Sequence, residues 1–228
     1  CTIINNDNFA ISTGADNVKN ITGDMTIYGN GPDGIYVQGE TVYTGTWLNH
    51  EVPFFIEDTI KVADGDTLTL TAGNELRFWS WGSEASYGIV VKGTLIAEGT
   101  DEEPIVFTSN QDIPAPGDWM GLWFDEADAG CSLTYCDIQW AGNGGNSGIW
   151  AGIAITGSGS NISIDQCTID FTGSDGIHLY ESSPLISNTV VQNSGGTGIF
   201  CDTGSPQISN CTIQNNSEGI YSVNQDSD

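Results

Sequence analysis

The residues best equipped for chemistry in this chain are carboxylates that gather in short segments rich in turn-forming residues. Carboxylate oxygens are the ligands that Ca²⁺ prefers, and closely spaced carboxylates are a common way to bind it. We therefore expect calcium as the cofactor of these segments. None of them follows the EF-hand loop pattern, and an acidic surface without specific metal sites is the alternative. The candidate ligands are Asp64, Asp66, Asp101, Glu102, Asp125, Glu126 and Asp128.

A second group of candidate residues consists of rings, most of them spaced along the C-terminal half. Aromatic side chains beside a few polar groups, here Glu181 and Asp202, are typical of ligand-binding surfaces and would suit a sugar. Rings also cover flat sheets by packing on one another across strands. A polysaccharide partner and a structural covering are therefore both open. The rings are Tyr36, His178, Tyr180, Phe200 and Tyr221.

The elements that must position these side chains follow from a repeat in the C-terminal third. Segments that begin at Ile164, Ile186 and Ile208 lie 22 residues apart, and each is followed by a Gly-Ile pair. A fixed period of this length is the signature of a solenoid. Each unit consists of short alternating strands punctuated by Gly, Asn and Ser, with no helical periodicity. The sequence predicts an all-β fold, a single-stranded parallel β-helix with coils of about 22 residues.

Alternation along each strand predicts which side chains face the core. Adjacent coils lie ~4.8 Å apart, so equivalent residues stack directly on one another. Most of the cysteines then become small buried thiols; a disulfide framework is the alternative, as is lipidation for Cys1. The outward row expected to form an amide ladder is Gln139/Asp170/Gln192/Gln214. The predicted inward rows are Cys136/Cys167/Thr189/Cys211, Ile138/Ile169/Val191/Ile213, Ile153/Ile177/Ile199/Ile220 and Ile155/Leu179/Cys201/Val223.

The two ends of the chain match each other. Residues 1–6, Cys-Thr-Ile-Ile-Asn-Asn, repeat as residues 211–216, Cys-Thr-Ile-Gln-Asn-Asn, and after one extra residue Ile11 aligns with Ile220. The chain is then either one unit of a tandem array or a subunit that stacks end to end; chance similarity between ordinary coils is the third interpretation. Open coil ends expose strand edges that need a cap or a partner. The residues expected at a stacking surface are Cys1, Ile3, Cys211, Ile213 and Ile220.

Turn dipeptides divide the chain into three parts. Residues 1–38 are predicted to be the closing coils of a preceding β-helix unit, and residues 39–52 a junction. Residues 53–228 are predicted to form a β-helix of their own, with an opening and capping module (53–130) and regular coils (131–228).

Three stretches of the opening module resemble a known family. They are residues 89–100 (IVVKGTLIAEGT), 104–109 (PIVFTS) and 117–124 (GDWMGLWF). They are similar to the opening module of bacterial and archaeal extracellular right-handed parallel β-helix repeat proteins of the pectate-lyase-like superfamily. The resemblance covers roughly residues 54–228 and implies a right-handed coil and an extracellular or cell-surface location. It implies little about function, because such modules occur in enzymes, adhesins and other surface proteins alike.

Enzymatic activity of the kinds found in this superfamily is not expected. Its polysaccharide lyases generally use Lys or Arg near bound Ca²⁺, and the chain has no Lys or Arg after Lys92. Its hydrolases use clustered aspartates, whereas Asp137 and Asp170 fall in different rows of neighbouring coils. We therefore expect a structural unit of a stalk, adhesin or filament that propagates by end-to-end stacking. A carbohydrate-binding or polysaccharide-cleaving module is the alternative.

The charge of the chain limits its partners. The formal net charge is −26, from 30 Asp and Glu residues against 4 Lys and Arg. Nucleic acid is not expected, because phosphate binding requires clustered basic side chains. No run is long and apolar enough to span a bilayer, so membrane insertion is not expected either. The partners that remain are a second copy stacked head to tail, flanking β-helix units of a larger chain, or a polysaccharide.

Overall fold

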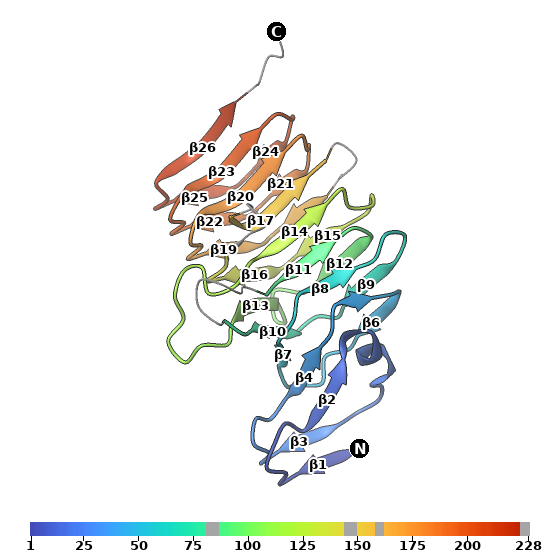
Figure 1. Ribbon diagram of the computed structural model, residues 1–228. Coiled ribbons are helices and arrows are strands. Elements are labelled where there is room, and N and C mark those ends of the chain that lie inside the picture. The colour runs from blue at the N-terminus through green and yellow to red at the C-terminus, as the bar shows by residue number, and fades with distance from the viewer. Residues whose placement is uncertain (81–86, 144–149, 158–161, 224–228) are drawn as a thin grey trace.

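The computed structural model describes residues 1–80, 87–143, 150–157 and 162–223. Within these ranges the strands wind into a rod of stacked coils, with the N-terminal strands at one end and the C-terminal strands at the other (Figure 1). The predicted all-β, right-handed parallel β-helix is confirmed. The helix found in the described residues, η1 (Ala15–Asn20), is a six-residue 3-10 turn, and no helix there is long and apolar enough to cross a membrane.

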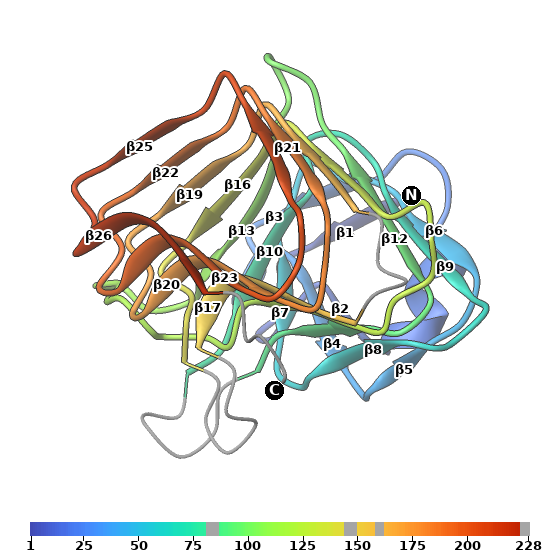
Figure 2. The ribbon, with the colours of Figure 1, turned by 90° about the horizontal axis from the view of Figure 1, so that it is seen from above.

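Three long parallel sheets form the sides of the rod, and each successive coil adds one strand to each of them (Figure 2). Sheet B consists of β2 (Ile11–Gly14), β4 (Ile35–Gln38), β7 (Phe54–Ile56), β10 (Glu75–Phe78), β13 (Ile105–Ser109), β16 (Cys136–Gln139), β19 (Thr168–Asp170), β22 (Val190–Gln192) and β25 (Thr212–Gln214). Sheet C consists of β5 (Thr41–Val42), β8 (Ile60–Val62), β11 (Ile89–Val91), β14 (Leu122–Asp125), β17 (Ala151–Thr156), β20 (Asp175–Tyr180), β23 (Thr197–Asp202) and β26 (Glu218–Val223). Sheet D consists of β6 (Gly45–Trp47), β9 (Thr67–Leu70), β12 (Thr94–Glu98), β15 (Ser132–Thr134), β18 (Ser163–Asp165), β21 (Leu185–Ser187) and β24 (Gln207–Ser209). A small sheet A pairs β1 (Thr2–Ile4) with β3 (Thr26–Tyr28) at the N-terminal end.

The core is a set of aliphatic rows that run along the rod. Parallel in-register pairing places Val191 directly between Ile169 and Ile213, as the repeat predicts. Three of the four predicted inward rows are confirmed. The fourth needs a correction, because Cys201 pairs with Ser222 and not with Val223. Side chains alternate with a period of two, so the inward position that follows Ile220 is 222 even though the apolar residue stands at 223.

Residues 39–52 do not form the expected junction. They supply β5 and β6, the first strands of sheets C and D, while β4 pairs directly with β7. Sheet B therefore runs without a break from residues 1–38 into the part that begins at Pro53. The expected fresh start at Pro53 came from turn signals, but those turns are ordinary corners of a continuous β-helix.

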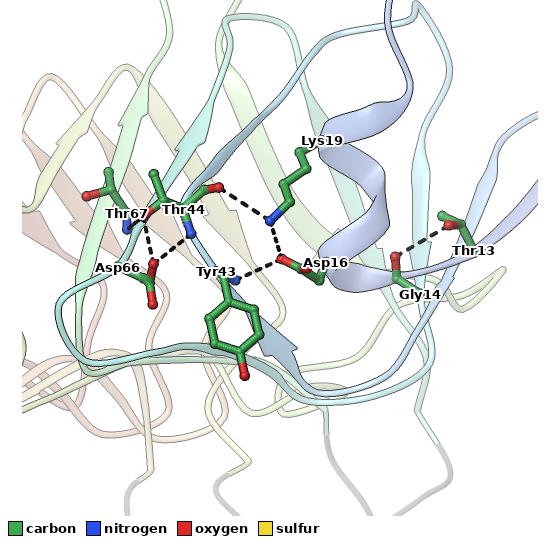
Figure 3. Close-up of polar contacts among 8 residues, drawn as sticks. All are labelled: Thr13, Gly14, Asp16, Lys19, Tyr43, Thr44, Asp66 and Thr67. Atoms are coloured by element: carbon green, nitrogen blue, oxygen red, sulfur yellow. Dashed lines mark hydrogen bonds and ion pairs between the residues drawn. The ribbon is translucent and has the colours of Figure 1, made fainter.

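The turn η1 covers the N-terminal ends of sheets C and D. Its Ala15 and Val18 are buried against the core. The Oδ1 of Asp16 accepts hydrogen bonds from the backbone N–H of Tyr43 (3.0 Å) and from Lys19 Nζ (2.7 Å), which ties the turn to the corner between β5 and β6 (Figure 3). This turn is an N-terminal cap that covers the core at sheets C and D, whereas sheet B extends past it.

Candidate functional site

Three of the candidate rings form a stacked ladder on the outer face of sheet C. The rings of His178 and Phe200 lie 4.7 Å apart with 21° between their planes, and those of Phe200 and Tyr221 lie 5.5 Å apart with 25° between their planes. The Nδ1 of His178 also lies 3.0 Å from a carboxylate oxygen of Asp175. The ring faces inside the ladder are therefore occupied by other rings. Tyr221, 41% exposed, is the last ring and presents its outer face beyond the final coil.

Tyr36 does not belong to this ladder, so the candidate rings do not form the one group expected from the sequence. It lies on sheet B near the opposite end of the rod, where it stacks on Phe9 at 4.8 Å and 19°. The candidate rings thus belong to two separate ring ladders, one on sheet B at the N-terminal end and one on sheet C at the C-terminal end. Tyr180 lies on the outer rim of β20, where the neighbouring carboxylate of Glu181 raises its pKa.

Four of the seven candidate metal ligands lie near one another where sheet C turns into sheet D: Asp64, Asp125, Glu126 and Asp128. Asp125 forms an ion pair with Lys92 (2.9 Å), and this carboxylate raises the pKa of the Lys92 amine. Asp64 and Glu126 line the same shallow pocket as that pair. The nearby Asp128 accepts a hydrogen bond from the backbone N–H of Gly65 (3.0 Å).

The remaining candidate carboxylates also have structural partners or lie apart. Asp66 accepts hydrogen bonds from the N–H and the hydroxyl of Thr44 at 2.9 and 2.7 Å, which lower its pKa (Figure 3). Asp101 and Glu102 lie between β12 and β13, away from the others. Among the described residues no three His, Cys, Asp or Glu side chains gather as a metal-binding group. Calcium binding by these carboxylates stays a prediction.

A groove of about 370 Å³ lies where sheets D and B meet. Its lining includes Asp101, Tyr135 and Asp137. Burial raises the pKa of Asp137. The neighbouring carboxylate of Asp170 lies in another row, where it is held by amides.

The predicted outward row on sheet B is confirmed by strand pairing, and side-chain amides link its last three members. Gln192 Nε2 donates to Asp170 Oδ2 (2.9 Å), and Gln214 Nε2 donates to Gln192 Oε1 (2.8 Å). Asn193 Nδ2 donates to the second oxygen of Asp170 (2.7 Å). Both oxygens of this carboxylate are therefore engaged along the stack.

The cysteines are free thiols, and no disulfide links them. Four of them are buried, as expected for small core thiols: Cys131, Cys136, Cys167 and Cys201. The last three belong to the predicted inward rows. Cys211 is half-buried because no further coil covers it within the described residues, and Cys1 is exposed at the opposite end.

The predicted stacking residues lie at the two open ends of the rod. Ile220 is 49% exposed, whereas Ile199, its equivalent one coil earlier, is 0% exposed. Ile213 and Cys211 are half-buried beside it. In the described part of the chain β25 and β26 each pair on one side, with β22 and β23. At the N-terminal end β1, which carries Ile3, pairs only with β3 within the same ranges.

Two asparagines that sequence reasoning missed shape the corners next to these ends. Asn216 Nδ2 donates to the backbone carbonyl of Val191 (3.1 Å), and its Oδ1 accepts from the N–H of Ser194 (2.9 Å), both in the preceding coil. Asn30 makes the same pair of bonds at the other end, to the carbonyl of Ile3 (3.1 Å) and from the N–H of Asn6 (3.1 Å). The signal available in the sequence was an Asn at the second position after these strands.

Comparison with known proteins identifies two parts of the chain. Residues 151–228 match the family model of the right handed beta helix region, and residues 40–124 match that of the pectate-lyase like beta helix domain. No curated protein and no solved structure matches the chain. Folds of this kind serve both enzymes and proteins without catalytic activity, so the function has to be argued from the surfaces described above.

Proposed function

We propose that this chain, of which residues 40–124 and 151–228 match β-helix family models, is a structural unit of an extracellular stalk, adhesin or filament that extends by end-to-end stacking of its coils. The observation that carries the proposal is the contrast between the last coil and the interior coils. Ile220 occupies the row position of the fully buried Ile199 but is half exposed. An open strand edge with exposed core residues is a surface that proteins normally cap or pair.

The free energy of burying apolar surface indicates how many contacts two copies need at the seam, the surface where the end of one copy stacks on the next. Complete burial of an Ile side chain contributes about 1.5–3 kcal/mol, whereas association costs roughly 4–15 kcal/mol in lost freedom. Ile220 alone is therefore insufficient. Several groups have to contribute to the free energy of association together. They are the unpaired backbone edges of β25 and β26, the ring of Tyr221 and the half-buried Ile213. Assembly is expected to depend on protein concentration.

A structural role is supported by how the polar groups of the regular coils are used. Both oxygens of Asp170 accept hydrogen bonds from amides, and the His178 ring is stacked on Phe200 and held by Asp175. No Lys or Arg follows Lys92 that would neutralise an acidic sugar. These groups serve the stacking of coils and present no acid–base pair to a substrate.

The polysaccharide alternative would have to use the edges of the stacked rings, the exposed Tyr180 or the groove beside Asp137. A glycan array with the purified chain tests it, together with the variants Tyr180→Ala and Asp137→Ala. Sugar binding by the wild type that is lost in either variant, with an unchanged circular dichroism spectrum, would favour a carbohydrate-binding role over the proposed one.

The proposed function is tested by negative-stain electron microscopy and sedimentation velocity over a range of protein concentrations. Unbranched fibres or concentration-dependent growth of the particles are expected. Uniform short rods at every concentration would refute self-assembly. Adding Ca²⁺ to one sample and a chelator to another tests whether a metal holds the stacked copies together, because the fibres would then dissolve in the chelator. The calcium prediction for the candidate carboxylates is tested separately by titrating the purified chain with Ca²⁺.

A further inference from the structure

The two ends of the rod carry the same type of corner. The inference drawn from this similarity rests on the proposed stacking and specifies which strands would pair. In the C-terminal coils, Asn216 bridges β25 to the carbonyl of Val191 in β22. At the N-terminal end, Asn30 bridges β3 to the carbonyl of Ile3 in β1 in the same way. The pair β1/β3 is therefore built like the pair β22/β25, although it lies in sheet A and not in sheet B.

Strand β2, the next strand in the chain, also lies one sheet away from the strands that it resembles. Ile11 follows Ile3 by eight residues, as Ile199 follows Val191. By this spacing β2 corresponds to β23 and β26, which are strands of sheet C. In the structure, however, β2 pairs with β4 in sheet B. Both N-terminal strands thus lie one sheet away from the C-terminal strands that they resemble.

We propose that β25 and β26 of one copy pair with β1 and β2 of a second copy of this chain, so that sheets B and C of the first continue as sheets A and B of the second. Each unit is then rotated by one sheet position about the rod axis relative to its neighbour. In this register Ile213 lies opposite Ile3 of the second copy, Ile220 opposite Ile11 of the second copy, and Tyr221 opposite Ser12 of the second copy.

The ring ladders are placed to join across such a seam. Within one chain Ser12 pairs with Tyr36, and the ring of Phe9 stacks on Tyr36 at 4.8 Å beside that small side chain. Tyr221 ends the sheet C ladder within the described residues and is 41% exposed. In the proposed register the ladder of Phe200 and Tyr221 therefore meets Phe9 of the second copy and continues along sheet B.

A glycine in the last coil supports the same register independently. A Cβ on Gly198 would lie 2.5 Å from Ile213 Cγ2 and 2.7 Å from Asn216 Nδ2, so the next coil excludes a side chain there. Gly219 holds the same position in the last coil, yet no described atom lies within 4 Å of its added Cβ. Ile3 and Asn6 of a second copy, the matches of Ile213 and Asn216, would occupy that space.

The register is tested by cross-linking at residue 214 in a background with Cys1→Ser and Cys211→Ser. Ile4 matches Gln214 in the end alignment, so Gln214→Cys combined with Ile4→Cys should give a ladder of multimers with a short bismaleimide. The matched control combines Gln214→Cys with Ser12→Cys, which would come close only if sheet B of one copy continued as sheet B of the next. Each single variant should stop at dimers.

The outcomes separate the register from the proposed function. A ladder from the 214/4 pair supports the rotated seam. A ladder from the 214/12 pair, or fibres with no ladder from either pair, would overturn the register while end-to-end stacking stands. A wild-type chain that never grows beyond short rods would overturn both.

A second variant keeps the test independent of cross-linking chemistry. Gly219→Ala should leave the unfolding midpoint of the isolated chain unchanged, because its Cβ meets nothing there, but weaken association at least tenfold. Ile113→Ala, at a residue that is 88% exposed and lies between β13 and β14, is the control for a general loss of apolar surface. Equal association of the Gly219→Ala variant and the wild type would overturn the proposed contact.

Discussion

The backbone of Gly198 and the side chain of Ile213 approach so closely that a Cβ on Gly198 would stand 2.5 Å from Ile213 Cγ2. Gly198→Ala is therefore expected to force the last two coils apart, at a cost of about 1–3 kcal/mol typical of overpacking. Thermal unfolding followed by circular dichroism measures this, with a fall in midpoint of roughly 2–4 °C per kcal/mol. Gly219→Ala in the isolated chain is the control, and an equal fall in both variants would contradict the explanation.

The N-terminal cap is expected to weaken in acid. Hydrogen bonds from Lys19 and Tyr43 lower the pKa of Asp16, and hydrogen bonds from Thr44 lower that of Asp66. A carboxyl whose folded pKa is depressed stabilises the protein above its unfolded pKa, and this contribution is lost as the pH falls through the folded pKa. The cap should therefore loosen below about pH 4.

Hydrogen exchange of the Tyr43 and Thr44 amides, measured between about pH 7 and pH 3 and corrected for intrinsic rates, follows this loosening. The double variant Asp16→Asn, Asp66→Asn should show exchange at neutral pH as fast as that of the acidified wild type, with little further dependence on pH. A variant that retains the acid dependence of the wild type would show that other carboxylates control the cap.

The thiols are expected to react in the order of their exposure. A hydrogen bond with Cys167, together with burial, raises the pKa of Cys136 well above its ordinary value, so little nucleophilic thiolate forms. Iodoacetamide at mildly alkaline pH, followed by peptide mass spectrometry, should modify Cys1 rapidly and Cys136 only after denaturation. Cys211 should react at an intermediate rate in the isolated chain and become protected in fibres. Fast labelling of Cys136 in the folded chain would mean that its row opens readily.

Assembly is expected to strengthen with salt. Each copy carries a formal net charge of −26, so two copies repel one another over distances that salt screens; the Debye length falls from about 30 Å at 0.01 M to about 10 Å at 0.1 M. Light scattering at fixed protein concentration should rise as NaCl is increased over this range. A scattering signal that falls with salt would indicate that specific ion pairs, and not coil stacking, hold the seam.

The rows of the regular coils could be predicted because their causes are local. Strand alternation and a constant coil length place Ile169, Val191 and Ile213 on one line without any knowledge of the rest of the fold. The amide ladder of Asp170 and Gln192 follows from the same alignment. The apolar character of Val223 suggests an inward position, whereas strict alternation along the strand places Ser222 there. Alternation decides, because the backbone pairing of a strand does not let one residue shift by itself.

The sheet to which the N-terminal strands belong could not be predicted. The segment around Ile35 has the corner spacing of a sheet C strand, yet it pairs with Phe54 in sheet B. The spacing between two strands in the sequence reflects the turn that connects them. The sheet that a strand joins depends instead on which distant strand has an unpaired edge next to it. For the same reason Tyr36 was grouped with Phe200, although Phe9 is its stacking partner.

The coil, its period and the residues that stack can therefore be read from the amino-acid sequence, because they depend on neighbours along the chain and on a repeated spacing. The displacement of the rod ends by one sheet, the occupied ring faces and the exposure of Ile220 and Gly219 become visible only in the folded chain. Those properties depend on long-range strand pairing and on what covers the last coil, and neither is encoded within a single repeat.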